Sequence, residues 1–232
     1  NTIGAVVGVQ PFGGRGLAGT GPKAGGPLIL RRLVAQCPAM VGLPRGMTAG
    51  PVPEMMQTWH DWLMGTGQRQ VALRVAEMMK TPLSGARMVL PGPVGEENLY
   101  RLMPRGNVLC IGGGTREELL TLVSMALSCG NTVFVTGAEG DTAWLSGLPT
   151  DIARHVHAVH DLGQHAYAVV LGARDGDSFR TITHTLATGN GAIASAFVLQ
   201  DGDLRREFLV EEQCRSTNTA AAGGNASLMA IG

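Results

Sequence analysis

Residues 107–135 read NVLCIGGGTREELLTLVSMALSCGNTVFV, and this stretch decides the fold class of the chain. A short apolar run reaches three glycines, and Thr115 and Glu118 beyond them have the spacing of a helix capping box. A Gly-Asn pair then closes the helical segment before a second β-prone run. The predicted elements are a strand at 107–111, a helix at 117–129 and a strand at 132–135. This βαβ order predicts an α/β fold, a Rossmann-like parallel sheet flanked by helices.

The alternation of helices and strands continues on both sides of this unit. Upstream, residues 54–64 and 68–80 predict two helices separated by Gly-Thr-Gly, and residues 28–35 could form two helical turns. The Pro- and Gly-rich stretch at 90–98 predicts a turn. Downstream we expect a helix running into a short strand at 151–160, a strand at 167–171, a helix at 178–187, a strand at 193–199 and a helix at 203–213.

The first 30 residues have a different character. Residues 3–9 are an apolar, β-prone run that predicts a buried strand, and residues 10–27, QPFGGRGLAGTGPKAGGP, follow it with seven glycines. So many glycines suit a loop that approaches something closely, because each one costs backbone entropy. Such loops typically present backbone N–H groups to an anion or another ligand.

Composition places the chain among globular proteins and excludes several functions. It has 232 residues, 44% of them hydrophobic, and its 18 basic residues balance 18 acidic ones, so no charge pattern favours nucleic acid or a membrane surface. No apolar run approaches the length of a membrane span. Only 16% of residues are charged, which suggests that other protein covers much of the surface. The four cysteines lack metal-site or disulfide spacing, which predicts reduced thiols and a cytoplasmic location.

No catalytic constellation is recognisable in the sequence. The turn Gly112-Gly113-Gly114 could offer a helix N-terminus to a phosphate, but it lacks the full dinucleotide spacing and fits a plain tight turn better. Adjacent glutamates, as in Glu211-Glu212, do not face each other and are interpreted as solvated residues. Four histidines between 155 and 165 lack supporting carboxylates or cysteines, so surface histidines are favoured over a metal site.

The glycine-rich beginning resembles a known family. Residues 1–14, continuing through 19–27, closely resemble the end of the glutamate-semialdehyde dehydrogenase domain of proline utilization A, a bifunctional bacterial enzyme that oxidises proline to glutamate. The resemblance implies that Phe12 lines the aldehyde pocket and that backbone N–H groups around Ala18 and Gly19 hold the substrate carboxylate. The family usually has Ser where this chain has Ala18, so only the backbone contact is expected here.

A second resemblance lies within the chain. Residues 91–106 and 126–133 are similar to the first βαβ of the cofactor domain in the aldehyde dehydrogenase superfamily, and 182–219 to its closing segment. Residues 218–224 echo residues 1–5. This abridged copy lacks the family's Trp-Asn-Phe-Pro turn, its cofactor-gripping Lys and its catalytic cysteine segment. It is therefore predicted to be a noncatalytic domain that holds no cofactor or metal.

The resemblance implies three parts and a set of partners. We expect residues 1–30 to end a catalytic domain, 31–50 to be a linker and 51–232 to be a noncatalytic aldehyde-dehydrogenase-like domain that covers a substrate passage or aids assembly. Because the chain begins with Asn inside a predicted strand, we expect upstream domains, with NAD and FAD bound in that longer protein. A homo-oligomer is left open. The alternatives are a regulatory nucleotide-binding module at 112–115 and an independent small dehydrogenase.

Overall fold

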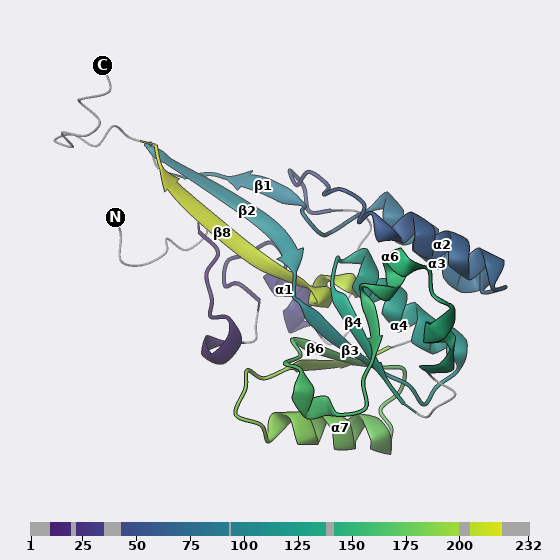
Figure 1. Ribbon diagram of the computed structural model, residues 1–232. Helices are drawn as coiled ribbons and strands as arrows, with labels where there is room; N and C mark the ends of the chain where they lie inside the picture. The colour runs from purple at the N-terminus through teal and green to yellow at the C-terminus, as the bar shows by residue number, and fades with distance from the viewer. Residues whose placement is uncertain are drawn as a thin grey trace, which may run out of the picture.

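The computed structural model describes residues 10–19, 22–34, 43–92, 94–137, 142–199 and 205–219. In this part of the chain an α/β unit carries an antiparallel ribbon that projects from one side (Figure 1). The predicted strand at 3–9, the centre of the predicted linker and the small-residue segment 220–232 lie outside the described residues.

The α/β unit is built on a five-stranded parallel sheet with the order β5-β4-β3-β6-β7. The strands are β3 (Asn107–Ile111), β4 (Thr132–Thr136), β5 (Val156–Ala158), β6 (Val169–Gly172) and β7 (Ser195–Val198). The predicted α/β class with a Rossmann-like parallel sheet is thus confirmed. Because the chain leaves β3 in one direction and returns at β6 on its other side, the sheet has a topological switch point between these two strands.

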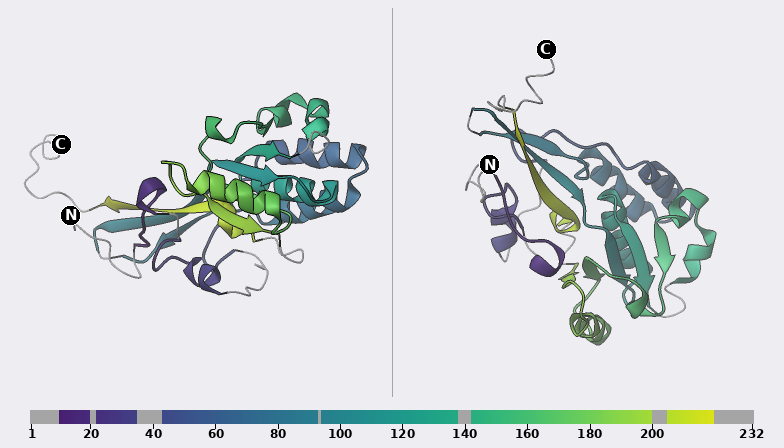
Figure 2. Two further views of the ribbon diagram at one scale, coloured as in Figure 1. Left: turned by 90° about the horizontal axis from the view of Figure 1, so that it is seen from below. Right: turned by 60° about the vertical axis from the view of Figure 1, so that its left-hand side comes forward.

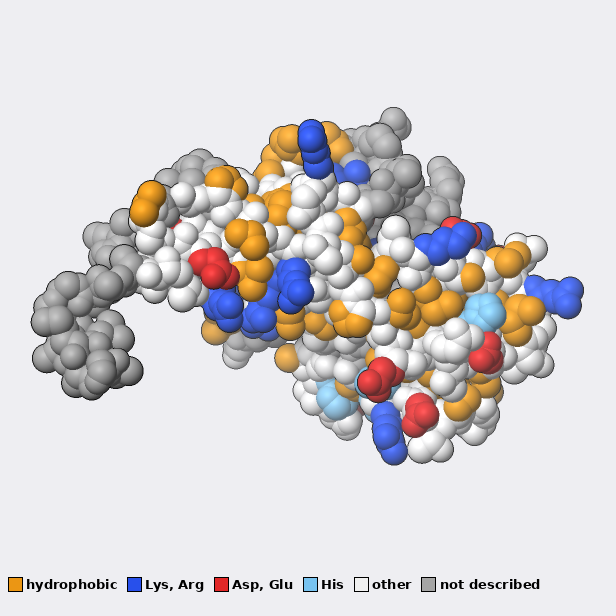
Figure 3. Space-filling view, turned by 90° about the horizontal axis from the view of Figure 1, so that it is seen from above, with side chains coloured by type: hydrophobic (Ala, Val, Ile, Leu, Met, Phe, Trp, Pro, Cys, Tyr) orange, Lys and Arg blue, Asp and Glu red, His pale blue; other side chains and the backbone are white. Residues whose placement is uncertain are grey.

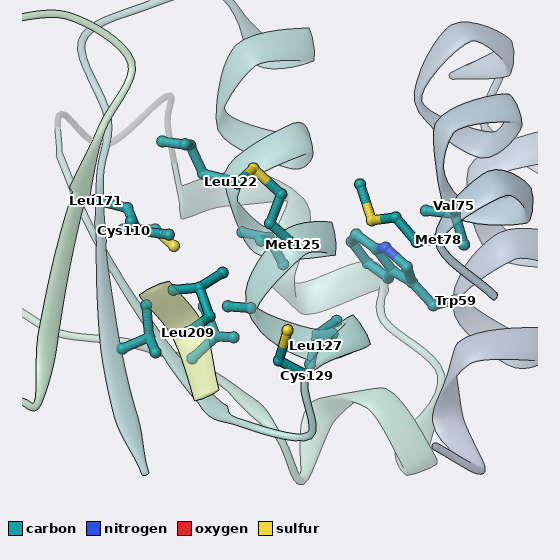
Figure 4. Close-up of a cluster of buried hydrophobic side chains, with 14 of the residues drawn as sticks. Trp59, Val75, Met78, Cys110, Leu122, Met125, Leu127, Cys129, Leu171 and Leu209 are labelled. Atoms are coloured by element: carbon teal, nitrogen blue, oxygen red, sulfur yellow. The ribbon is translucent and has the colours of Figure 1, made fainter. Parts of the chain in front are cut away.

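Helices lie on both faces of this sheet, with α4 (Arg116–Ser128) on one face and α7 (Asp177–Ala187) on the other (Figures 1 and 2). The helices α2 (Met55–Gly65) and α3 (Arg69–Lys80) pack against α4, and α6 (Thr150–Ala153) precedes β5. The strands sort their side chains by the period of two: Val108 and Cys110 join the core under α4, while Leu109 and Ile111 join the smaller core under α7. Figure 4 shows how α2 and α3 extend the main core beyond α4. Trp59 of α2 and Met78 of α3 lie on the side of these two helices that faces α4.

The predicted capping box of α4 is present. The backbone N–H of Glu118 donates to Thr115 Oγ1 at 3.2 Å, and the backbone N–H of Thr115 donates to Glu118 Oε2 at 2.6 Å. Gly130 follows the helix with a φ of 75°, the left-handed conformation expected of a glycine after a helix. Local sequence signals therefore fix both ends of the central helix.

The projecting ribbon was not fully predicted. Its strands are β1 (Arg87–Leu90), β2 (Glu96–Pro104) and β8 (Val210–Asn218), antiparallel in the order β1-β2-β8. The predicted helix at 203–213 is wrong: the described residues form a short 3-10 helix, η4 (Arg206–Leu209), and then β8. Nine residue pairs with β2 outweigh the local helix preference of this segment.

Four short helical segments complete the described structure. They are η1 (Gly16–Ala18), α1 (Ile29–Leu33), η2 (Ala143–Gly147) and η3 (Leu162–Gln164). The helix α1 agrees with the helical turns expected at 28–35, and Leu28 just before it is fully buried in the main core. The start of the described chain is therefore anchored in the same core as the α/β unit.

Candidate functional site

The glycine-rich segment closes on itself as a loop. Phe12 and Ala24 form an antiparallel bridge, with the N–H of Ala24 donating to the carbonyl of Phe12 at 2.7 Å and the reverse bond at 3.2 Å. Inside the loop, a Cβ on Gly14 would lie 2.0 Å from the carbonyl oxygen of Ala18. Glycine is thus required there by a close backbone approach, as the sequence suggested for this loop.

The three residues predicted to contact substrate lie at different depths. The side chain of Phe12 is 45% exposed, Ala18 is exposed on η1, and Gly19 is half-buried at the wall of a cavity of about 230 Å³. That cavity lies between the loop and the α/β unit, which contributes Arg105, Tyr167 and further residues. The structure gives these positions, and the predicted roles of the three residues stay predictions.

Charged groups in the cavity wall already hold partners within the chain. Arg15 Nε lies 2.9 Å from Glu211 Oε2, and the ammonium of Lys23 donates to the carbonyl of Gly13. Arg105 donates to the carbonyl of Phe208 at 3.3 Å. These contacts hold the wall of the cavity together from the loop, from the ribbon base and from η4.

Glu212 of β8 is a buried acidic residue that faces the glycine-rich loop. Its side chain accepts a hydrogen bond from Tyr100 Oη at 2.7 Å and one from the backbone N–H of Lys23 at 3.0 Å, and the residue is only 2% exposed. A Cβ on Gly26 would lie 2.5 Å from Glu212 Oε1. The interpretation of Glu211 and Glu212 as solvated residues is therefore wrong for Glu212, which points into the seam because β8 is a strand.

Two further contacts join the first segment to the ribbon and to η4. Gln10 Nε2 donates to Glu96 Oε1 at 2.6 Å and to Asn98 Oδ1 at 3.4 Å on β2. Arg31 Nε donates to Glu207 Oε1 at 3.1 Å, and Glu207 is 1% exposed. We call residues 10–31, with the facing groups of β2, η4 and β8, the loop seam.

A second cavity of about 250 Å³ lies where Gly112-Gly113-Gly114 follows β3. It sits at the carboxyl ends of β3 and β6, the switch point at which parallel sheets commonly bind ligands. However, the N-terminus of α4 already receives the Glu118 carboxylate, which also lies 3.2 Å from Arg174 Nη2. The backbone N–H and the hydroxyl of Thr115, together with Arg174, hold the pKa of Glu118 below its usual value.

These residues do not fit the pyrophosphate of a dinucleotide. An internal carboxylate occupies the position at the α4 N-terminus where a phosphate would be bound. The ring of Phe179 also closes on Gly172, where an added Cβ would lie 2.4 Å from the ring. The cavity therefore has the placement of a nucleotide site without its anion-binding end.

Two of the four clustered histidines, His157 and His165, pack against the ring of Phe134. The ring centroid of Phe134 lies 4.4 Å from that of His165 and 5.4 Å from that of His157. Among the described residues no group of three or more His, Cys, Asp or Glu side chains is placed to hold a metal ion. In the face shown in Figure 3, acidic and basic side chains are interspersed with uncharged ones.

Two observations concern the expected reduced thiols and the expected lack of a membrane span. Cys110, Cys129 and Cys214 are free, and Cys37 lies outside the described residues. None of the helices in the described ranges has the length and hydrophobicity of a membrane span.

Comparison with known proteins identifies one family. No protein-family model matches the chain. The whole chain is 40% identical over 242 residues to the bifunctional protein PutA of Rhizobium meliloti, and 35% identical over 248 residues to that of Escherichia coli K12. Over its whole length the chain is therefore similar to a segment of PutA. It spans only 19% and 18% of the length of these two relatives.

A solved PutA structure has the same fold. The structure of proline utilization A from Corynebacterium freiburgense superimposes with a TM-score of 0.55 and 21% identity, over 94% of this chain and 20% of that protein. The sequence identities of 40% and 35% over the whole chain confirm the resemblance to proline utilization A seen in the sequence. The superposition shows that this chain has the fold of a segment of that protein.

Proposed function

We propose that this chain is the carboxyl-terminal part of a cytoplasmic bifunctional enzyme that oxidises proline to glutamate. In that enzyme, FAD serves the proline dehydrogenase and NAD the glutamate-semialdehyde dehydrogenase, both bound by upstream domains of the same polypeptide. This chain supplies the substrate-anchor loop and a noncatalytic α/β domain. The observation that carries the proposal is the sequence identity of 40% and 35% with two bifunctional PutA proteins over the full length of the chain.

In this proposal the loop of residues 10–27 binds the substrate. Phe12 packs against the aldehyde chain, and backbone N–H groups of the loop around Ala18 and Gly19 hold the carboxylate. The exposure of Phe12 and Ala18 supports this, because both face outward where an upstream domain could complete the pocket. The close approach of Gly14 to Ala18 supports a loop whose backbone geometry is fixed before the substrate arrives.

The remainder, residues 51–232, is proposed to hold no cofactor and to act by covering the passage between two active sites or by aiding assembly. The internal carboxylate of Glu118 at the α4 N-terminus supports the loss of cofactor binding. Residues 220–232, rich in Ala and Gly, suit close packing against another protein surface. No described feature favours nucleic acid or a metal as a partner of this segment.

The test removes residues 220–232 from the full-length enzyme and leaves β8 intact. We expect slower coupled turnover of proline to glutamate, with each half-reaction unchanged when its own substrate is supplied. Analytical ultracentrifugation of the same variant separates a channel role from an assembly role. Unchanged coupled turnover together with an unchanged oligomeric state would refute the proposal for this segment.

The alternative to be tested is a regulatory nucleotide-binding module, suggested only by the place of the cavity at the carboxyl ends of β3 and β6. Titration calorimetry of this chain with NAD and NADH distinguishes a nucleotide-binding module from a domain that holds no cofactor. Binding with a Kd below about 100 μM, roughly −5.5 kcal/mol, would favour the module. We expect no such binding, because the Glu118 carboxylate already accepts from the backbone N–H of Thr115 at the α4 N-terminus, where a phosphate would be expected to bind.

A further inference from the structure

The loop seam joins the proposed substrate loop to β8 through one buried carboxylate. Glu212 is 2% exposed, and its side chain accepts from the backbone N–H of Lys23 at 3.0 Å. Lys23 lies on the returning arm of the loop, next to the Ala24 that bridges Phe12. A buried carboxylate therefore fixes the backbone of one arm, and the bridge passes that constraint to the other arm.

The inner face of the ribbon is shaped for this contact. On β2 the buried positions alternate as Asn98, Tyr100 and Leu102, and on β8 Glu212 pairs with Leu102. Tyr100 Oη donates to Glu212 Oε1 at 2.7 Å, so one carboxylate oxygen is held by the ribbon while the other accepts from the loop. Burying a carboxylate is costly unless hydrogen bonds compensate it, so each lost donor has a large effect.

Steric fit adds a second constraint. A Cβ on Gly26 would lie 2.5 Å from Glu212 Oε1 and 3.0 Å from the carbonyl oxygen of Lys23. Only glycine at this position lets the chain turn over the carboxylate without displacing it. The loop and Glu212 thus fit each other both in hydrogen bonding and in shape.

We propose that Glu212 is a positioning residue for the substrate loop, so that the carboxyl-terminal strand of the ribbon sets the loop geometry that binds a small aldehyde carrying a carboxylate. This inference rests on the proposed function, in which the loop binds glutamate semialdehyde. It gives the noncatalytic domain a direct part in substrate binding, separate from covering a passage or aiding assembly.

The test uses Glu212→Gln in the full-length enzyme, with steady-state kinetics of semialdehyde oxidation. Gln offers one acceptor oxygen where the carboxylate offers two, so one of the bonds to Tyr100 and Lys23 is lost. We expect KM for the semialdehyde to rise about 10-fold, as for one charge-assisted hydrogen bond, while kcat changes less than about twofold. The control Glu97→Gln, on the exposed side of β2, should leave both constants unchanged.

Two further variants keep the test decisive if Glu212→Gln does not fold. Tyr100→Phe removes one donor without changing charge, and a rise in KM of about 3-fold is expected. Gly26→Ala should raise KM in the wild-type background and have a smaller effect beside Glu212→Ala, because the shorter side chain makes room for the added methyl group. Additive effects of Gly26→Ala and Glu212→Ala would overturn the proposed fit.

Gly19→Ala separates failure of this inference from failure of the proposed function. If Gly19→Ala raises KM but Glu212→Gln and Tyr100→Phe do not, Glu212 has no positioning role and the loop still binds substrate. If none of the three changes KM, the substrate role of the loop is wrong as well. A fall in the active fraction with unchanged KM would show that Glu212 serves folding alone and would also overturn the inference.

Discussion

Arg206 of η4 forms the end cap of α3, and replacing it gives a sharp test of how the carboxyl-terminal segment is held. The residue is 8% exposed, and its Nη1 donates to the carbonyl of Met78 at 3.2 Å. Its Nη2 donates to the carbonyl of Thr81 at 3.1 Å and to Thr81 Oγ1 at 3.0 Å. Since α3 ends at Lys80, these bonds serve carbonyl groups at the end of the helix, and the Met78 carbonyl also accepts from the backbone N–H of Thr81 at 3.4 Å.

The size of the effect follows from burial and hydrogen bonding together. Arg206→Met keeps the aliphatic stem and removes all three bonds. Each hydrogen bond to a buried charged donor contributes roughly 1.5–3 kcal/mol, but the three are not additive. Burial also lowers the pKa of Arg206, which marks a desolvation cost that the substitution removes. We therefore expect the free energy of unfolding to fall by about 3 kcal/mol.

Urea unfolding of the chain, followed by tryptophan fluorescence, measures this change. The indoles of Trp59, Trp62 and Trp144 pack against one another beside α3, so their signal reports the affected region. The matched control is Arg154→Met, whose guanidinium is 72% exposed and lies 4.0 Å from Asp151, for which we expect a loss below about 0.5 kcal/mol. A loss for Arg206→Met no larger than that of the control would refute the capping role.

Two further predictions concern titratable groups. Because the pKa of Glu118 is lowered in the folded chain, its stabilising contribution is present above the ordinary carboxyl pKa and is lost as the pH falls through the lowered value. Glu118→Gln should therefore cost about 0.5–1 kcal/mol at pH 7 and nothing measurable near pH 2 in urea unfolding. Burial raises the pKa of Cys129 to about 11, so iodoacetamide should modify the half-buried Cys214 well before Cys129, as mass spectrometry can determine. The raised pKa of Cys129 also means that stability falls as the pH rises from the ordinary thiol pKa toward 11, and modification of Cys129 ahead of Cys214 at pH 8 would contradict its burial.

The central βαβ unit could be predicted because its signals are local. The capping box at Thr115 and Glu118 fixes the start of α4, and Gly130 fixes its end, each within a few residues of the element it limits. The strands on either side are short apolar runs that a buried parallel sheet requires. No distant contact is needed to recognise any of these elements.

The ribbon and the loop seam could not be predicted in the same way. Residues 210–218 carry two glutamates and a glutamine, which favour helix locally, and only pairing with β2 makes them a strand. Once the segment is a strand, the period of two places Glu212 on the same side as the buried Val210 and leaves Glu211 beside it more exposed. Alternation along 210–214 was therefore the one signal that could have predicted the buried carboxylate.

The loop seam also bears on where this chain can be divided. A boundary near residue 30 remains a prediction, yet groups on its two sides are packed together: Leu28 is fully buried in the main core, and Arg31 contacts the buried Glu207. A fragment that began at residue 51 would lose Lys23 as a donor to Glu212 and would expose apolar core that Leu28 now covers. Burial of one Leu side chain alone contributes about 2 kcal/mol. The substrate loop and the α/β unit therefore stabilise each other. Because they do, β8 near the end of the chain can set the geometry of the loop at its beginning.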